Sequence, residues 1–350
     1  MSSSQSRSVP LVNRSPAKRP VSSTPRSPLA SPNKSPSKSR SGRLSRAVSR
    51  LSVSDSIDIF ESPSVLLEIS QTVVKAGFPG DAVPQVTYHT DIPLWNRPDD
   101  ESADIPPVRL YLLNVLQEIL IQSLLVTPKS ISVFVLESPL ISNTFKQLIG
   151  QVLLLDLQVK SVTFQPLAVN AVVGAGASCG LVIDLGWDEA AMIPVYDLRE
   201  LSSKARFTTR STKKLFHKYR DTALAESKPF TTWREFRHQT LASTFSTSEI
   251  TELAQELFIK QNEPYPDDDN LSLPLVISKL IGSLDANLRG PCSENIVFTG
   301  GLQLPPEIYI SIINEVQTSW PKARLIHSIG SWAGASAYLS SIIAYHSQLH

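Results

Sequence analysis

The sequence is poor in cysteine and has no long apolar run. Cys179 and Cys292 are the only cysteines, and they form no CxxC pair. This pattern excludes a disulfide framework and favours a reducing compartment. No stretch approaches the roughly 18 uninterrupted apolar residues of a membrane-spanning helix, and the start of the chain does not read as a signal peptide. We therefore expect a cytoplasmic protein without membrane insertion.

Acidic residues are missing from the first 50 positions, which hold eleven Lys and Arg residues. The rest of the chain has 22 basic against 32 acidic residues, so the net charge of +1 describes neither part. Residues 1–60 are also rich in serine and proline and almost free of aromatic side chains. Such a composition cannot offset the entropy of ordering its backbone and predicts a disordered basic tail.

The tail carries five Ser/Thr-Pro sites of the kind that proline-directed kinases modify. The phosphorylation candidates are Ser15, Thr24, Ser27, Ser31 and Ser35. Each phosphate adds almost two negative charges, so full modification would cancel or reverse the charge of the tail. Two interpretations stay open. The tail is either an arm, tuned by phosphorylation, for an acidic partner such as a microtubule, a nucleic acid or an acidic protein, or a solvated extension.

Beyond residue 60, apolar segments with strand and helix character alternate. Two β-branched runs within 63–77 predict a hairpin, and residues 108–126 have apolar side chains at helical spacing. Further strands are expected at 130–140, 159–165, 179–186 and 190–198, further helices at 143–155, 167–176, 274–289 and the C-terminus, and a strand, Gly-Gly turn and helix at 294–316. Alternation of this kind predicts an α/β architecture with mixed sheets.

Five segments, taken in order, resemble the actin family. They are "KAGFPGDAVPQ" (75–85), "VFVLESPLISNTFKQLIGQVLL" (133–154), "GLVIDLGWDEAAMIPVYDL" (180–198), "LDANLRGPCSENIVFTGGLQLPPEIY" (284–309) and "SIGSWAGASAYLSSI" (328–342). The resemblance implies an actin-like two-lobed fold, with ribonuclease H-like duplicated mixed sheets, flanking helices and nucleotide in a cleft between the lobes. It assigns residues 61–168 plus 325–350 to the first lobe and 169–324 to the second.

The phosphate loops implied by this resemblance depart from the family pattern. Such loops need glycines, because phosphate must approach backbone N–H groups closely. In the first loop Glu68 keeps an acidic side chain, but Ser70 and Thr72 stand at the two glycine positions, with Gln71 between them.

The second loop is also only partly kept. Asp184 and Gly186 match the family pattern, whereas Trp187 stands at an acidic position and Asp188 at a glycine position. We expect the tryptophan to obstruct phosphates or plug the cleft, and the aspartate to place negative charge near them.

Hydrolysis further needs a group that positions the attacking water. Leu167 stands where the family has a glutamine, and Gln165 lies two residues away. ATP hydrolysis is therefore not expected, and no cofactor is required, although bound ATP or ADP stays possible. The vestigial nucleotide-binding candidates are Lys75, Asp184, Gly186, Gly300 and Gly301. No catalytic or metal-ligating residues are expected, because the histidines lack metal-site spacing.

The region expected to contact a neighbouring protomer is short. Actins have a whole small subdomain at their pointed end, where this chain has only the proline-rich residues 88–107. A protomer without that surface would bind a filament end and stop growth. This combination is similar to the pointed-end type of actin-related protein in dynactin. It implies a non-catalytic capping and scaffolding subunit of the cytoskeleton, with actin-like filament subunits and pointed-end dynactin subunits as partners, and dynein and microtubules as indirect partners.

Two other classes stay open. A nuclear actin-related subunit of a chromatin-remodelling complex would use the tail and the basic segment 199–220 on nucleic acid. A basic run is more often a solvated face, so nucleic acid is not the expected partner. A divergent ATPase of the actin superfamily is disfavoured by the missing loop glycines.

Overall fold

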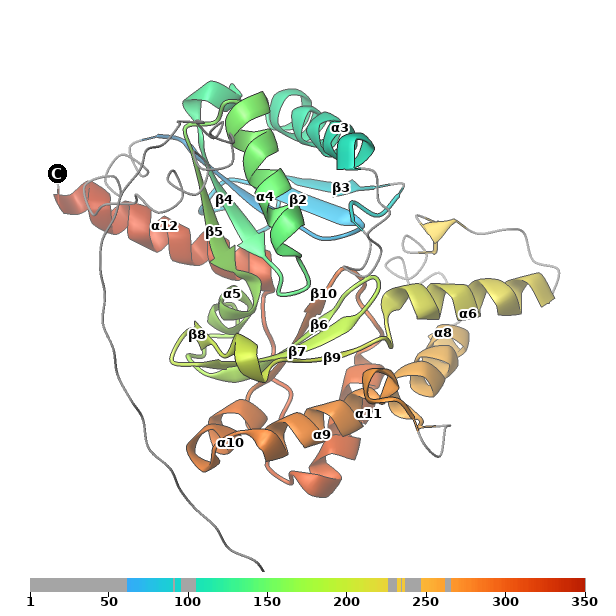
Figure 1. Cartoon of the computed structure of the whole chain (residues 1–350). Helices are drawn as coiled ribbons and strands as arrows, with labels where there is room; N and C mark the ends of the chain where they lie inside the picture. Colours follow the sequence, from blue (N-terminus) through green and yellow to red (C-terminus); the bar gives the residue numbers. More distant parts are fainter. Residues whose placement is uncertain are drawn as a thin grey trace, which may run out of the picture. The chain divides into compact units, whose positions relative to one another are not determined.

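The computed structural model describes residues 62–90, 92–95, 105–225, 232–233, 235–236, 247–261 and 266–349 (Figure 1). Contacts group Ser52–His350 as one compact unit. The predicted tail, residues 1–60, and its phosphorylation candidates from Ser15 to Ser35 lie outside the described residues. The described part is an α/β protein with two mixed sheets and flanking helices, which confirms the predicted fold class at this level.

The first sheet has the strand order β3-β2-β1-β4-β5. Its strands are β1 Ser64–Ile69, β2 Val73–Gly77, β3 Val86–His89, β4 Ser132–Glu137 and β5 Ser161–Pro166. Neighbours among β1, β2 and β3 are antiparallel, β4 runs parallel to β1, and β5 runs parallel to β4. The predicted hairpin at 63–77 is therefore part of the antiparallel half of a mixed sheet.

The second sheet has the strand order β10-β6-β7-β8, with β9 also paired to β7. This order corresponds to β4-β1-β2-β3 in the first sheet. Its strands are β6 Gly180–Leu185, β7 Ala190–Tyr196, β8 Arg199–Glu200, β9 Arg206–Thr208 and β10 Ile296–Gly300. β7 lies antiparallel to β6, β8 and β9, whereas β10 lies parallel to β6. An isolated parallel bridge joins Ile296 to Leu325, at the place beside β10 that corresponds to β5 beside β4. Both sheets thus combine an antiparallel meander with parallel additions.

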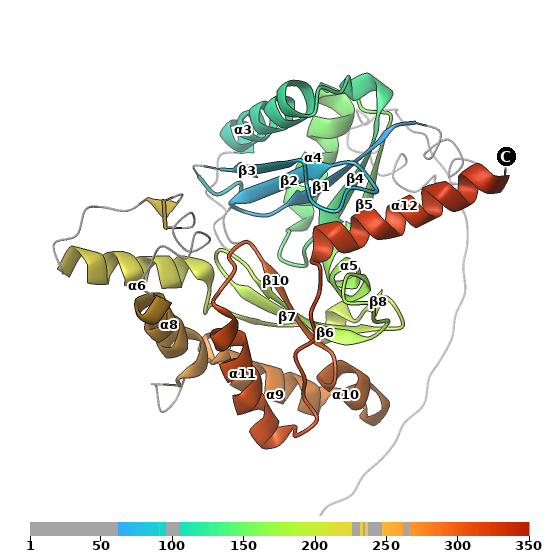
Figure 2. The ribbon, with the colours of Figure 1, turned by 180° about the vertical axis from the view of Figure 1, so that it is seen from behind.

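Helices flank both sheets (Figures 1 and 2). They are α3 Ile105–Gln117, α4 Asn143–Gln151, α5 Leu167–Val173, α6 Thr212–Ala225, α8 Thr247–Ala254, α9 Leu273–Ser283, α10 Ala286–Ser293, α11 Pro306–Ser319 and α12 Ser331–Leu349. Short π-helical turns continue α3, α4 and α8. α3 and α4 pack on one face of the first sheet and α12 on the other. α5 packs on the second sheet, opposite α6 and α8 to α11.

The apolar run of β1 follows from this layering. Val65 and Leu67 pack with α3 and α4, whereas Leu66 packs with Trp332 of α12 on the opposite face. Successive side chains of a strand point to opposite faces, so a strand covered on both sides reads as continuously apolar.

α5 and α12 pack against each other at glycines. A Cβ on Gly334 of α12 would overlap the Asn170 carbonyl oxygen, and a Cβ on Gly174 would lie 2.7 Å from the Gly330 carbonyl oxygen. Only glycine permits so close an approach to backbone. Because α5 packs on the second sheet and α12 on the first, this contact joins the two layers.

The helix predicted at 274–289 is two helices. α9 and α10 are separated by Leu284 and Asp285, which have extended backbone, so the predicted stop at Gly290-Pro291 is wrong and lies inside α10. Leu284 is 1% exposed, so its side chain anchors the break between α9 and α10 in the hydrophobic core. Arg289 Nε donates to the Leu284 carbonyl at 2.8 Å, which satisfies a group left free by the end of α9.

The two cysteines lie in different environments. Burial raises the pKa of the Cys292 thiol to about 11, as for a core residue, and Cys179 is partly exposed. Among the described helices, none has the length and apolar character needed to cross a membrane.

Candidate functional site

Of the five nucleotide-binding candidates, Lys75 lies on β2 and Asp184 on β6, whereas Gly186 follows β6 and the pair Gly300 and Gly301 lies at the end of β10. Ser138, directly after β4, donates a 2.9 Å hydrogen bond to the carboxylate of Asp184 on β6. Their exposed fractions are 6% and 5%. The first and second sheets are therefore joined by a buried bond between a hydroxyl and a carboxylate.

The carboxylate of the first loop, Glu68, has a partner on each oxygen. Lys75, directly opposite on β2, donates to Oε1 at 2.5 Å, and Ser331 at the start of α12 donates to Oε2 at 2.6 Å. Glu68 is only 3% exposed. The acidic residue kept in the first loop and the nucleotide-binding candidate Lys75 thus bind each other.

Asp184 has the strongest electrostatic perturbation in this region. Burial raises the pKa of its carboxyl group to about 6, the Ser138 hydrogen bond opposes the rise, Glu68 adds to it and Lys75 opposes it. The net result shows that the donors around Asp184 do not offset the loss of water.

The turns at the tips of the two hairpins bind each other. Gln71 Nε2 donates to Asp188 Oδ2 at 2.7 Å, and the Asp188 backbone N–H donates to Gln71 Oε1 at 3.3 Å. Gln71 Nε2 also donates to the Trp95 carbonyl at 3.0 Å. The amide of Gln71, a residue that is 6% exposed, is therefore fully hydrogen-bonded.

Lys213 completes the environment of Asp188. Its ammonium group lies 2.9 Å from Asp188 Oδ1, so each carboxylate oxygen has a side-chain partner. Lys213 belongs to the first turn of α6, where the N–H groups of Thr212 and Lys213 donate to the carbonyls of Gly186 and Trp187. The second hairpin turn therefore also caps α6.

Trp187 packs toward the helices of the second sheet. Its ring centroid lies 4.4 Å from that of Trp233 and 6.3 Å from that of Phe216 on α6. Its Nε1 is buried and has no hydrogen-bond partner among the described residues. The tryptophan at an acidic position of the family pattern thus extends an aromatic cluster of the second core.

Two of the three candidate glycines have local packing reasons. A Cβ on Gly186 would lie 2.6 Å from the Glu189 carbonyl oxygen. Gly300 has φ of +134°, and a Cβ there would overlap the Leu185 carbonyl oxygen. Gly301 has open space within 4 Å of its hypothetical Cβ. Gly186 and Gly300 are therefore explained by the backbone around them, without a ligand.

The residues near the expected water-positioning glutamine lie as follows. Leu167 is the first residue of α5 and is buried with Trp332 and Leu136. Gln165 lies on β5, and its Oε1 is buried with no hydrogen-bond partner among the described residues. Leu167 has no amide side chain, and the amide of Gln165 lies on β5 and not on α5, so neither residue supplies the glutamine that the family has on this helix.

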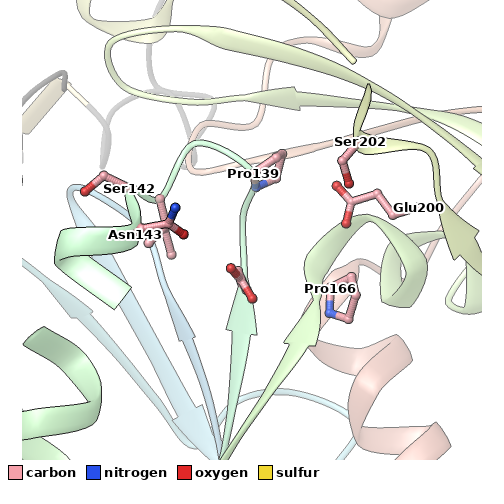
Figure 3. Close-up of a pocket in the computed structure, with 8 residues that line it drawn as sticks. Pro139, Ser142, Asn143, Pro166, Glu200 and Ser202 are labelled. Carbon is pink, nitrogen blue, oxygen red and sulfur yellow. The ribbon is translucent and has the colours of Figure 1, made fainter. Parts of the chain in front are cut away.

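A cavity of about 480 Å³ lies beside the start of α4 (Figure 3). It is lined by Glu137, Pro139, Ile141, Ser142, Asn143, Pro166, Glu200 and Ser202. Glu137 is ion-paired with Lys146 at 2.6 Å, and burial together with Glu137 raises the pKa of Glu200. None of the five nucleotide-binding candidates lines this cavity.

Several partners in the site carry no sequence motif. Ser138, Ser331 and Lys213 were not among the expected site residues. Ser331 lies 263 positions from Glu68, and Ser138 lies 46 positions from Asp184. Serines at such separations give no signal of their own before the chain is folded.

No protein-family model matches the chain. Within the part of the chain that the structure describes, no group of three or more His, Cys, Asp or Glu side chains could hold a metal ion.

Proposed function

We propose that the chain is a non-catalytic actin-like subunit that caps the pointed end of the dynactin mini-filament. In this role it scaffolds the pointed-end subunits and supports dynein-based transport along microtubules. The carrying observation is that Glu68, the acidic residue kept in the first loop, and Asp188, which stands at a glycine position of the second loop, are already bound by the protein. Glu68 is held by Lys75 and Ser331, and Asp188 by side chains of the first hairpin and of α6. A metal or phosphate would have to displace these bonds.

The repeated strand order supports the actin-like part of the proposal. Each sheet combines a meander with parallel additions, and the Ile296–Leu325 bridge extends the second sheet as β5 extends the first. A duplicated mixed sheet is what the resemblance to actins implies. The helices that follow, α5 and α12, pack on opposite sheets and against each other.

The connection between β3 and α3 supports the capping part. β3 ends at His89 and α3 begins at Ile105, so residues 90–104 make the whole connection. So short a segment leaves no chain for a separate subdomain with its own core. The protomer would bind a filament end and offer no normal surface for the next actin-like subunit.

Purification of the tagged full chain from its own cells tests the assignment. We expect mass spectrometry to identify actin-like filament subunits and pointed-end dynactin subunits, in a cytoplasmic fraction. Recovery of chromatin-remodelling subunits from nuclei instead would replace the proposal with the nuclear alternative.

Turnover measurements test the non-catalytic part. The purified chain is expected to release no phosphate from ATP above a blank, because Leu167 stands at the position of the family's water-positioning glutamine and Glu68 is already bound by Lys75 and Ser331. Sustained phosphate release that follows the protein through purification would favour the ATPase alternative. Bound ATP or ADP, detected after denaturation, would leave the capping role intact.

A further inference from the structure

The contact between the hairpin tips has the chemistry of an occupied anion site. The carboxylate of Asp188 receives the Gln71 amide on one oxygen and the Lys213 ammonium on the other, at 2.7 and 2.9 Å. The Asp188 side chain is 10% exposed, so it is largely removed from water. One donor comes from each sheet's part of the chain. Gln71 follows β1 of the first sheet, and Lys213 lies in the first turn of α6, which packs on the second sheet.

The orientation of Gln71 makes this contact specific. Its Nε2 faces two acceptors, Asp188 Oδ2 and the Trp95 carbonyl, whereas its Oε1 faces the Asp188 N–H. Rotating the amide by half a turn would place its oxygen against both acceptors and its N–H groups against a donor. Buried polar groups without partners are costly, so one orientation is selected.

We propose that Asp188 is an internal anion that fills a site built from the side chains of Gln71 and Lys213, and so holds the two sheets together without a ligand. A charge-assisted bond on each oxygen is stronger than a neutral hydrogen bond. Removing the carboxylate leaves the Gln71 amide and the partly exposed Lys213 ammonium without this acceptor, so we expect a small oxyanion supplied from solution, with inorganic phosphate as the probe, to bind them in its place. The proposed function supplies only the biological role of this contact. The contact itself is tested on the purified full chain, without any partner.

The first test compares thermal unfolding of the wild-type chain and Asp188→Ala, with and without inorganic phosphate at constant ionic strength. We expect the midpoint of Asp188→Ala to fall by about 3–6 °C, because the Gln71 amide and Lys213 lose their acceptor. Phosphate is expected to restore at least half of this loss and to leave the wild-type midpoint unchanged. An unchanged midpoint in Asp188→Ala would overturn the proposal.

Two variants separate an anion site from a general effect of salt or charge. Asp156→Ala removes a carboxylate from the more exposed ion pair with Arg109, and phosphate is expected to have no effect on it. Adding Lys213→Ala to Asp188→Ala is expected to abolish the restoration by phosphate. Equal restoration in all variants, or none in Asp188→Ala, would contradict the internal-anion proposal.

A milder variant covers the case in which Asp188→Ala does not fold. Lys213→Met keeps the Gln71 bond and removes the ammonium group, so we expect a smaller fall of the midpoint that disappears at high salt, where the wild-type ion pair is screened. A fall that is independent of salt would show that Lys213 acts only through packing, and would overturn its assigned part. Because these measurements need no partner, their outcome is separate from the capture of dynactin subunits.

Discussion

At the scale of single residues, the main feature of the site is a set of three largely buried carboxylates, which differ in how many hydrogen-bond partners they have. Glu68 and Asp188 each have two side-chain partners, whereas Asp184 receives one side-chain hydrogen bond, from Ser138. The difference appears in Asp184, whose pKa is raised to about 6 chiefly by burial. Ionisation of Asp184 therefore opposes folding at neutral pH, and its replacement is informative.

Asp184→Asn is expected to raise the free energy of unfolding by about 1–3 kcal/mol near pH 8, and by much less near pH 4. Because the folded pKa lies above the unfolded value, the folded chain binds more protons between these values. The stability from this group is present below about pH 4 and is lost as pH rises through about 6. Urea denaturation at both pH values measures the difference.

Ser138→Ala is the matched control for this prediction. It removes the hydrogen bond to the ionised carboxylate, so we expect it to lower the unfolding free energy more at the higher pH. If Asp184→Asn shifted stability equally at both pH values, the ionisation of Asp184 would not be the cause.

At the scale of elements, the decisive contact is between α5 and α12. Gly174 and Gly334 bring the two helices so close that a side chain at either position would meet backbone. Each helix also covers a sheet: Leu339 packs on the first and Val172 on the second. Spacing between these helices therefore affects both cores.

Gly334→Ala is expected to lower the free energy of unfolding by about 2–4 kcal/mol, because its Cβ would overlap the Asn170 carbonyl and force the helices apart. Gly150→Ala, in α4, is the control: nothing lies within 4 Å of its Cβ, and helix propensity predicts a gain of about 1 kcal/mol. Chemical denaturation of both variants measures the two changes in unfolding free energy. The prediction is wrong if Gly334→Ala does not lower this free energy, or if both variants change it by the same amount.

At the scale of the whole described molecule, several contacts connect the two sheets. They include the Ser138–Asp184 bond, the Gln71–Asp188 bond and the α5–α12 packing. Structural units that share buried contacts of this kind lose stability together when one is disrupted.

We therefore expect the two sheets to unfold in one cooperative transition. Tryptophan fluorescence and far-ultraviolet circular dichroism should give coincident urea curves, since Trp332 reports on the first sheet and Trp187 on the core of the second. Asp188→Ala combined with Gly334→Ala should separate the curves, because it removes two of the connections. Two resolved transitions in the wild-type chain would show that the sheets are independent.

The sequence by itself determined the alternation of strands and helices. The apolar run of β1 and the β-branched hairpin are local patterns that lie where they were expected. The helix predicted at 108–126 is α3, which begins earlier, at Ile105, and continues as a π-helical turn to Ser123. Local patterns failed at Gly290-Pro291, which lies inside α10 because buried Leu284 sets the break earlier.

Tertiary structure alone decided what the loop residues do. In the sequence Glu68 is only an acidic residue kept in the first loop, and the structure places Ser331, far along the chain, on its second oxygen. Asp188 reads as an intrusion at a glycine position until Gln71 and Lys213 are seen to bind it. The physical reason is that a polar side chain's role depends on which donors lie within about 3 Å of it, and folding brings those donors from distant parts of the chain.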